Sequence, residues 1–260
     1  MRTTLFLGPG FGALRGFVER LPERFAAGPC GEVLHAGRNT VAAFAVGDER
    51  LVVKRYERCG VWRGIVYGLF RRSKARRAYE HAVRLRALGI GTPEPVAWIE
   101  CRRRGLLRDA YSVTRRSDRR PLSRAAEAYP DPGAAEVLDA FARFAARLHE
   151  AGVCHDDFNH GNILWDRDPA TGDCRFELID INRMRFFRRP LSARRSMVSL
   201  RRLSCPPEAF LYLLDRYARH RGRSVEETLL GGLLLRLLFV RRKRFKRRLR
   251  ERHRALRAKK

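Results

Sequence analysis

The side chains best suited to chemistry are those of Asp157, Asn162 and Asp180. Asn162 follows Asp157 by five residues, a short apolar run comes next, and Asp180 ends a second apolar run. In phosphoryl transfer, the first carboxylate of such a pattern accepts the proton of the attacking hydroxyl group. The amide and the second carboxylate hold metal ions on the nucleotide phosphates. The order therefore predicts a phosphotransferase with Asp157 as the catalytic base and with Asn162 and Asp180 as metal ligands.

A small, hard cation fits these ligands best. Mg²⁺ binds oxygen ligands at short range and keeps waters and substrate phosphates in its other positions. We therefore expect ATP and Mg²⁺ as cofactors, with Mn²⁺ as the alternative ion. Any single Asp or Asn in this stretch would more often be a solvated turn residue. The prediction depends on the joint pattern of a long helix, the Asp–Asn loop, two short strands and the terminal Asp.

The other polar residues of the loop have lesser expected roles. His155 is expected to pack and hydrogen-bond so that it fixes the loop. Asp156 is expected to be a solvated or loop-bonding carboxylate, and His160 is either solvated or close to the acceptor.

Candidate contacts to the nucleotide phosphates precede this loop in the chain. Lys54 ends a β-branched strand, where a lysine would neutralise the α- and β-phosphates, and Glu80 in the next helix is its expected ion-pair partner. Gly37 and Asn39 lie in the turn between the first two strands, where backbone amides could contact phosphate. With one glycine in the turn, this last signal is weak.

Spacing patterns predict the elements that must position these residues. Strands are expected over 33–35, 41–46, 51–54, 96–101 and 106–114, and helices over 13–24, 73–88, 134–151, 207–220 and 225–240. The helix over 73–88 has Ser73 as its N-cap and Gly89 as its stop. A basic and aromatic insert over 58–72 would either lie on a membrane surface or pack onto the small lobe.

Together these elements predict an α+β, two-lobed fold. We expect a lobe over 1–114 with a small β-sheet and one main helix, a mainly helical lobe over 115–232, and a basic amphipathic helical tail over 233–260. No role beyond packing and acceptor recognition is assigned to 1–30 or 184–232.

Composition limits the possible size of the core and the expected cellular compartment. The 260 residues are 45% hydrophobic, enough for one large core or two lobes sharing a cleft. The six cysteines show no CxxC spacing, which favours a reducing cytoplasm. The apolar run Leu5-Phe6-Leu7 is too short for a signal sequence, and no window reaches the roughly 18 apolar residues of a membrane span.

The basic tail suggests a partner. The net charge is +28, and the last 20 residues hold 13 Lys or Arg. The tail residues Leu238, Phe245, Leu249 and Leu256 fall near one helical face, as in helices that lie on an anionic membrane. A solvated helix and nucleic-acid binding are the alternatives. We favour the membrane, and expect no nucleic acid and no stable protein partner.

The chain resembles the lipopolysaccharide kinase family, the Kdo and heptose kinases of the bacterial outer-membrane core. The resemblance runs from about 33 to 183 and is carried by Lys54, by the segments 73–80 and 89–96, by His155 to Leu164, and by Leu178 to Arg183. It implies a protein-kinase-like fold and a lipid-linked glycan, the lipopolysaccharide inner core, as acceptor. It also implies Asp157 as the base, Asn162 and Asp180 as metal ligands, and Lys54 as a phosphate contact.

Departures from protein kinases agree with this interpretation. Asn159 stands where protein Ser/Thr kinases usually have Lys, and Asp180-Ile181-Asn182 replaces Asp-Phe-Gly. No Ala-Pro-Glu segment follows, so regulation by activation-loop phosphorylation is not expected. The lack of a multi-glycine phosphate loop is the departure that bears on nucleotide affinity.

The function that we expect is phosphorylation of a sugar hydroxyl, on Kdo, by a cytoplasmic kinase peripheral to the inner membrane. An atypical protein Ser/Thr kinase is one alternative. A non-catalytic pseudokinase or a basic nucleic-acid-binding protein is the other, and the intact set of Lys54, Asp157, Asn162 and Asp180 argues against it.

Overall fold

The structure is a computed structural model of the chain. It describes residues 2–28, 31–37, 39–56 and 72–258, with side chains up to residue 251. Most of the insert predicted over 58–72 lies outside the described residues. The chain divides into two units: Met1–Arg119 with Glu177–Met184, and Arg120–Phe176 with Arg185–Lys260.

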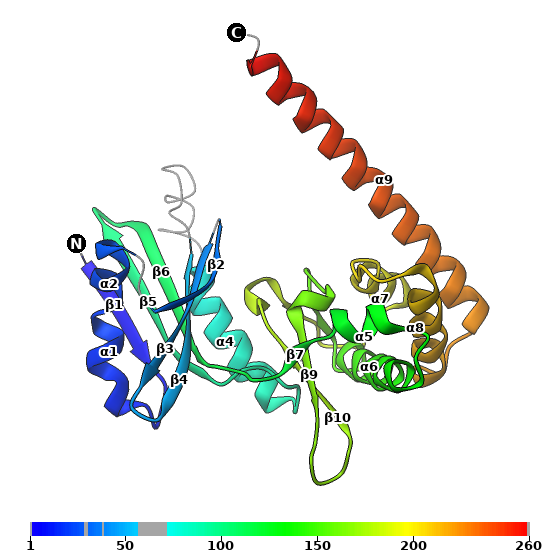
Figure 1. Cartoon of the computed structure of the whole chain (residues 1–260), viewed down its shortest axis with the longest axis horizontal. Coiled ribbons are helices and arrows are strands. Elements are labelled where there is room, and N and C mark those ends of the chain that lie inside the picture. The colour runs from blue at the N-terminus through cyan, green and yellow to red at the C-terminus, as the bar shows by residue number, and fades with distance from the viewer. Residues whose placement is uncertain (1, 29–30, 38, 57–71, 259–260) are drawn as a thin grey trace. The chain divides into compact units, whose positions relative to one another are not determined.

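The first unit is built on a six-stranded antiparallel sheet (Figure 1). The strands are β1 (Arg2–Leu7), β2 (Glu32–Ala36), β3 (Asn39–Val46), β4 (Glu49–Tyr56), β5 (Pro95–Arg103) and β6 (Leu106–Arg115), in the order β1-β5-β6-β4-β3-β2. Five of these strands agree with the predicted ones. The strand β1 was not predicted. It pairs with β5 along its whole length, and neither its short alternation nor this distant partner marks it as a strand in the sequence.

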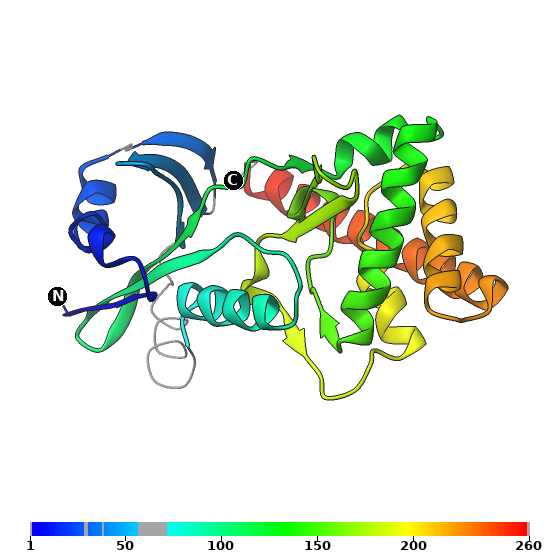
Figure 2. The same cartoon turned by 90° about the horizontal axis from the view of Figure 1, so that it is seen from below.

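Helices cover both faces of this sheet. The 3-10 helix η1 (Gly12–Leu14), α1 (Arg15–Glu19) and α2 (Leu21–Ala27) pack on one face through Phe17, Val18 and Leu21. The single helix predicted over 13–24 is thus broken into shorter pieces. The helix α4 (Lys74–Ala87) packs on the other face through Ala75 and Tyr79 (Figure 2).

The ends of α4 agree closely with the prediction. The Ser73 side chain accepts a hydrogen bond from the Arg76 backbone N–H, which satisfies one of the free amides at the start of the helix. After the helix, Gly89 has a φ of 67°, the left-handed conformation that favours glycine at a helix end.

The second unit is mainly helical. Its helices are α5 (Ser123–Ala128), α6 (Pro132–Glu150), α7 (Ala193–Leu200), α8 (Pro207–His220) and α9 (Val225–Ala258). Its shorter elements are β7 (Arg120–Pro121), β8 (Val153–Cys154), η2 (His160–Asn162), β9 (Ile163–Arg167), β10 (Cys174–Leu178, shared with the first unit) and β11 (Arg185–Phe186). The largest fully buried side chains of its core include Phe141, Phe158, Phe210 and Tyr217.

Two predicted boundaries need correction. The first unit extends past 114 to Arg119, because β6 runs to Arg115 and the Arg116 N–H donates to the Arg50 carbonyl at 2.7 Å. The tail does not start a new element at 233, because α9 is continuous from Val225. Gly231 and Gly232 do not break the helix. A Cβ on Gly232 would lie 2.5 Å from Leu214 Cδ1, so this glycine lets α9 approach α8 closely.

Candidate active site

Lys54 lies on the face of the sheet that carries α4. Residues alternate between the faces of a strand, so Leu51 and Val53 enter the core beneath α1 and α2, whereas Lys54 and Tyr56 point the other way. Lys54 Nζ forms an ion pair with Asp180 Oδ1 at 2.8 Å, with the two side chains 20% and 32% exposed. The structure thus brings together two of the predicted site residues.

Asp180 is held in an unusual backbone conformation. Its φ of 53° and ψ of 41° are left-handed, which is rare outside glycine and better tolerated by Asp and Asn. Asp180 precedes the 3-10 helix η3 (Ile181–Arg183), and its Oδ1 also accepts a hydrogen bond from Asn182 Nδ2. The conformation aims the carboxylate at Lys54, and such outliers concentrate at functional sites.

Hydrogen bonds tie the Asp180 segment to the first unit. The Leu178 N–H donates to the Gly91 carbonyl at 2.9 Å, and Thr92 Oγ1 donates to the Leu178 carbonyl at 2.8 Å. His81 Nδ1 donates to the Ile181 carbonyl at 2.8 Å, and burial lowers the pKa of His81. The sequence analysis gave no role to Thr92 or His81, because their partners are about a hundred residues away.

Glu80 is not the partner of Lys54, contrary to the prediction. Its carboxylate pairs with Arg76 at 2.9 Å and with Arg72 at 2.6 Å, and hydrogen bonds to both guanidinium groups lower its pKa against the opposing effect of burial. Arg76 lies one helical turn before Glu80 in α4, and Arg72 lies just before the N-cap Ser73, so both partners are close in the sequence. Lys54 instead reaches Asp180.

The phosphate loop was predicted at Gly37 and Asn39; Gly37 lies in the connection between β2 and β3, and Asn39 is already part of β3. Gly37 is exposed, and a Cβ there would lie 2.8 Å from His35 Nε2. Asn39 starts β3 opposite Tyr56. Their contact with phosphate stays a prediction.

The environment of Lys54 on the sheet is aromatic. Its Nζ lies 5.6 Å from the centroid of the Tyr56 ring, and Lys74 Nζ lies 5.9 Å from the same centroid. Burial raises the pKa of the Tyr56 hydroxyl, with the nearby Asp180 carboxylate acting in the same direction. Tyr56 therefore stays neutral and contributes its ring to a cation–π contact.

In the second unit, hydrogen bonds between residues close in the sequence hold the Asp157 loop. The Asp157 N–H donates to His155 Nδ1 at 3.1 Å, which confirms the expected structural role of the buried His155. Asn162 Nδ2 donates to the Asp157 carbonyl at 2.9 Å. Only the amide NH₂ can donate, so this bond leaves the Asn162 side-chain oxygen as the group available to a cation.

Phe158 anchors this loop in the core. Its side chain is fully buried, 5.7 Å from the Phe141 ring and 5.9 Å from the His155 ring. His160 is also buried, which excludes the solvated alternative, and burial lowers its pKa to about 4. Its Nε2 has no hydrogen-bond partner among the described residues.

Two arginines that the sequence analysis did not single out contact the loop. Arg202 Nη1 lies 3.6 Å from Asp157 Oδ1, and Arg185 pairs with Asp156 at 2.7 Å. Asp156 is thus ion-paired, whereas Asp157 remains 39% exposed. Both arginines lie in a basic stretch where many positions are alike, so no pattern in the sequence distinguishes them.

Each unit offers an oxygen donor that suits a hard divalent cation: Asp180 in the first unit and Asn162 in the second. Asn162 and Asp180 supply amide and carboxylate oxygens, the ligand type that Mg²⁺ prefers. Within the part of the chain that the structure describes, both contacts of the Asp180 carboxylate use Oδ1, which leaves Oδ2 open. No group of three or more His, Cys, Asp or Glu side chains arranged for a metal occurs among the described residues. In phosphoryl transfer, a cation held by one or two such donors takes water and substrate phosphates in its other positions.

Two solved structures are similar to this chain in fold. The structure of WaaP in complex with acyl carrier protein matches with a TM-score of 0.60 and 22% identity, over 95% of this chain and 99% of that one. A crystal structure of aminoglycoside-3'-phosphotransferase of type VIII matches with a TM-score of 0.54 and 20% identity, over 83% of this chain and 98% of that one. At these identities the likeness shows a shared kinase-like fold, which confirms the predicted fold class.

The family is shown by a separate comparison. A search of curated proteins gives no match. The model of the Lipopolysaccharide kinase (Kdo/WaaP) family matches residues 32–205, more than half of the chain and all four of Lys54, Asp157, Asn162 and Asp180. The chain therefore belongs to the lipopolysaccharide kinase (Kdo/WaaP) family and is an ATP-dependent phosphotransferase with a hydroxyl group as acceptor.

Proposed function

We propose that the chain transfers the γ-phosphoryl group of ATP to a hydroxyl group of Kdo in the lipopolysaccharide inner core. The observation that carries the proposal is the 2.8 Å ion pair between Lys54 and Asp180. It joins an amine suited to nucleotide phosphates and a carboxylate suited to their metal ion, from segments far apart in the chain. The family of the chain supplies the class of acceptor.

Each residue has one task in this proposal. Asp157 takes the proton of the attacking hydroxyl group, and its partly exposed side chain is accessible to an acceptor. The Asp157 N–H donates to His155 and the Asp157 carbonyl accepts from Asn162, and these two bonds fix the backbone of the residue. Lys54 binds the α- and β-phosphates and so orients the group that is transferred.

Asn162 and Asp180 would hold the divalent cation, which we propose to be Mg²⁺. The cation supplies neutralisation of the phosphate charge during transfer. Lys54 and Asn182 restrain the carboxylate of Asp180 through Oδ1, and the opposite oxygen is left for the cation.

Arg202 supports Kdo over heptose as the acceptor. Kdo is an acid sugar, and its carboxylate would complement a guanidinium group 3.6 Å from the candidate base. Heptose has no such group. Arg202 would therefore favour a sugar whose acid group lies near the hydroxyl that is phosphorylated.

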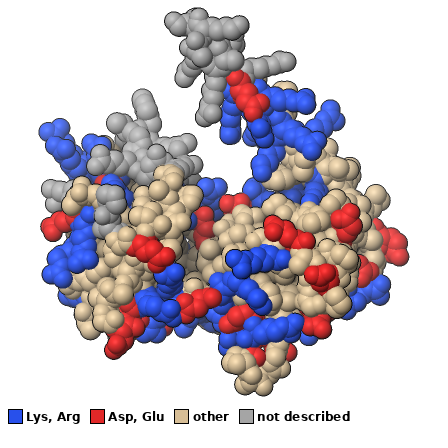
Figure 3. Space-filling view, in the orientation of Figure 1, with Lys and Arg blue, Asp and Glu red and all other residues tan. Residues whose placement is uncertain are grey.

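We propose a position on the cytoplasmic face of the inner membrane, held by α9. Exposed apolar side chains follow one side of this helix at Leu230, Leu234, Leu237, Leu238, Phe245 and Leu249. Eight of the ten residues over 241–250 are Lys or Arg, all exposed, and Figure 3 shows these basic side chains gathered along the helix. At about 1 kcal/mol for each basic residue near an anionic surface, this segment alone would bind such a membrane.

The predicted stripe included Leu256, whose side chain lies outside the described ones, and the structure adds Leu230, Leu234 and Leu237. No helix among the described residues is long and apolar enough to cross a bilayer. We do not propose a stable protein partner, and the acyl carrier protein is a feature of the WaaP structure.

One experiment tests the acceptor. Purified protein with labelled ATP is offered core lipid that carries Kdo alone, core lipid that also carries heptose, and a protein extract. We expect label in the Kdo-only lipid, in a reaction lost in the Asp157→Ala variant. Label only in heptose-bearing lipid would correct the sugar, and label only in protein would favour the atypical protein kinase.

A second experiment tests the membrane proposal. Co-sedimentation with phosphatidylglycerol vesicles should exceed that with phosphatidylcholine vesicles, and Leu234→Glu should weaken it. Equal binding to both vesicle types would contradict the proposal.

A further inference from the structure

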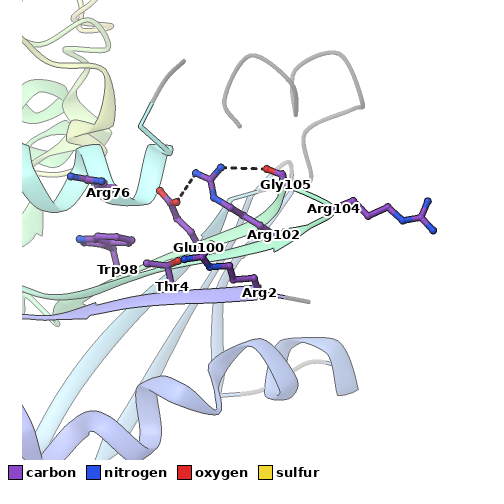
Figure 4. A pocket seen from close by; sticks show the side chains of 8 residues that line it. All are labelled: Arg2, Thr4, Arg76, Trp98, Glu100, Arg102, Arg104 and Gly105. Carbon is purple, nitrogen blue, oxygen red and sulfur yellow. Dashed lines mark hydrogen bonds and ion pairs between the residues drawn. The ribbon is translucent and has the colours of Figure 1, made fainter. Parts of the chain in front are cut away.

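A pocket of about 560 Å³ opens on the first unit, and none of the residues assigned to catalysis lines it. Its walls are formed by Arg2, Thr4, Arg76, Trp98, Glu100, Arg102, Arg104 and Gly105 (Figure 4). Four arginines face one carboxylate. Neither Lys54 nor Asp180 belongs to the lining.

The register of β1 and β5 places these side chains on one face. Arg2 lies opposite Arg102, Thr4 opposite Glu100, and Phe6 opposite Trp98. The neighbouring positions, such as Leu5, enter the core on the other face. Like charges directly opposite each other on two strands are destabilising, so the Arg2–Arg102 pair needs an anion near it.

Glu100 supplies only part of that charge. Its buried carboxylate accepts a hydrogen bond from Arg102 Nη2 at 2.9 Å, and Arg102 Nη1 donates to the Gly105 carbonyl at 3.4 Å. These bonds fix the Arg102 guanidinium at the pocket wall (Figure 4). Arg2 forms no ion pair with any described residue, and Glu100 is the one carboxylate among the described residues that line the pocket.

A third guanidinium is held in place from α4. Arg76 lies 5.4 Å from the centroid of the Trp98 ring and is bonded to Glu80. The Phe6 ring stacks on Trp98 at 6.0 Å with an angle of 7° between the planes. Trp98 thus packs between Phe6 and Arg76, and its ring orients the Arg76 guanidinium through the cation–π contact.

The turn at the rim carries a further arginine. Arg104 and Gly105 form the two-residue turn between β5 and β6, with φ values of 50° and 79°. Turns of this type strongly prefer Asn, Asp or Gly at the position of Arg104. The chain thus has an arginine at a position where the backbone conformation favours Asn, Asp or Gly. The Arg104 side chain extends outward from the rim (Figure 4).

We propose that this pocket is a second anion site that binds a phosphate monoester. Arginines from β1, β5 and α4 line it together with Thr4, and guanidinium binds phosphate oxygens through paired hydrogen bonds. A phosphate monoester has three terminal oxygens and can accept hydrogen bonds from three guanidinium groups, whereas a carboxylate has only two oxygens. The volume fits a phosphorylated sugar or a lipid headgroup.

The soluble source is tested by calorimetric titration of the full chain with glucose 6-phosphate, with glucose as the neutral counterpart. We expect binding of glucose 6-phosphate only, weakened on the order of tenfold by Arg2→Ala, since a charged hydrogen bond is lost. The matched control is Arg20→Ala, an exposed arginine of the same unit outside the pocket lining, which should leave affinity unchanged. Arg102→Ala also leaves buried Glu100 unpaired, so Arg2→Ala is the decisive variant if Arg102→Ala fails to fold.

The lipid source is tested by co-sedimentation with phosphatidic acid vesicles. A larger loss for Arg2→Ala than for Arg20→Ala identifies a headgroup ligand, and a response in the titration alone identifies a soluble one. Equal behaviour of the two variants in both measurements overturns the proposal. The Lys54→Ala variant should still bind glucose 6-phosphate. Loss of binding there would assign the ligand to the catalytic site instead, whereas failure of the kinase assay would leave this result unaffected.

Discussion

The first unit holds its candidate site residues through contacts between distant segments, whereas the second unit holds its own inside one short loop. Lys54 and Asp180 meet by an ion pair, and Asp180 is further restrained by the strained backbone before η3. Asp157 and Asn162 are joined by a hydrogen bond to a backbone carbonyl only five residues away. We therefore expect the Lys54–Asp180 pair to be sensitive to loss of either charge. We expect the Asp157 loop to be sensitive to loss of Phe158, its anchor in the core.

The largest effect should come from Asp180. The variant Asp180→Ala removes a proposed metal ligand and leaves Lys54 without its carboxylate, so turnover should fall at least as far as for Asp157→Ala. A coupled assay of phosphoryl transfer measures this. The control is Asp173→Ala, at an exposed turn, which should behave like the parent chain. Near-normal turnover of Asp180→Ala would contradict the proposed roles of Asp180 and Lys54 in phosphoryl transfer.

Asp157→Ala should lower turnover by roughly 10²–10⁴, the usual contribution of a general base. Nucleotide affinity should remain, because Lys54 and Asp180 are untouched. Turnover and a nucleotide-dependent thermal shift are measured side by side. Asp156→Ala, the adjacent carboxylate paired with Arg185, is the matched control. Equal losses for both variants would mean that the loop responds to any lost charge.

The core anchor of the loop should matter for stability. Phe158→Ala should lower the free energy of unfolding by about 3–5 kcal/mol, because a fully buried ring is removed. Denaturant unfolding measures the change. Phe245→Ala removes the same side chain from an exposed position of α9 and should change little. If the two variants were equally stable, Phe158 would not anchor the loop.

Acid should destabilise the second unit through His160. Its folded pKa is lowered to about 4, below the ordinary value, so the unfolded chain binds the proton more tightly. Stability is therefore present at neutral pH and is lost as the pH falls from about 6.5 toward 4, by up to about 3 kcal/mol for this group. The free energy of unfolding, measured by denaturant at several pH values in this range, should depend less on pH for His160→Gln than for the parent chain. The exposed His35→Gln should keep the slope of the parent chain.

Glu80 should have the smallest effect. Because it pairs with Arg72 and Arg76 on a partly exposed helix face, Glu80→Gln should change nucleotide affinity by less than about tenfold. Lys54→Ala, assayed in parallel, should weaken binding far more. A loss in Glu80→Gln as large as in Lys54→Ala would restore the ion pair that the sequence predicted.

Local order in the sequence was enough to predict much of the fold. The N-cap at Ser73, the stop at Gly89 and the alternation of β4 are properties of neighbouring residues, and the structure confirms them. The bonding role of His155 was accessible for the same reason, since its partner is two residues away.

Partner choice between distant segments was not accessible in this way. Glu80 was expected to pair with Lys54, but it pairs with Arg76, one helical turn away, and with Arg72, just before the helix. Arg202 could not be recognised among many similar basic residues, and β1 depends on its pairing with β5. Single-sequence patterns carry no information on which of several alike charges finds a given carboxylate.

The first half of α9 has a consequence for experiments on the tail. Arg236 donates to the Cys205 carbonyl at 2.6 Å and lies over the Phe210 ring. Phe239 lies beneath the guanidinium of Arg202, the same arginine that contacts Asp157. Deleting the chain from 233 onward would remove the Phe239 contact of Arg202, the arginine beside the proposed base Asp157. A loss of activity in that variant would give no information on lipid binding. A cut after 240 removes the exposed basic segment alone and separates anchoring from catalysis.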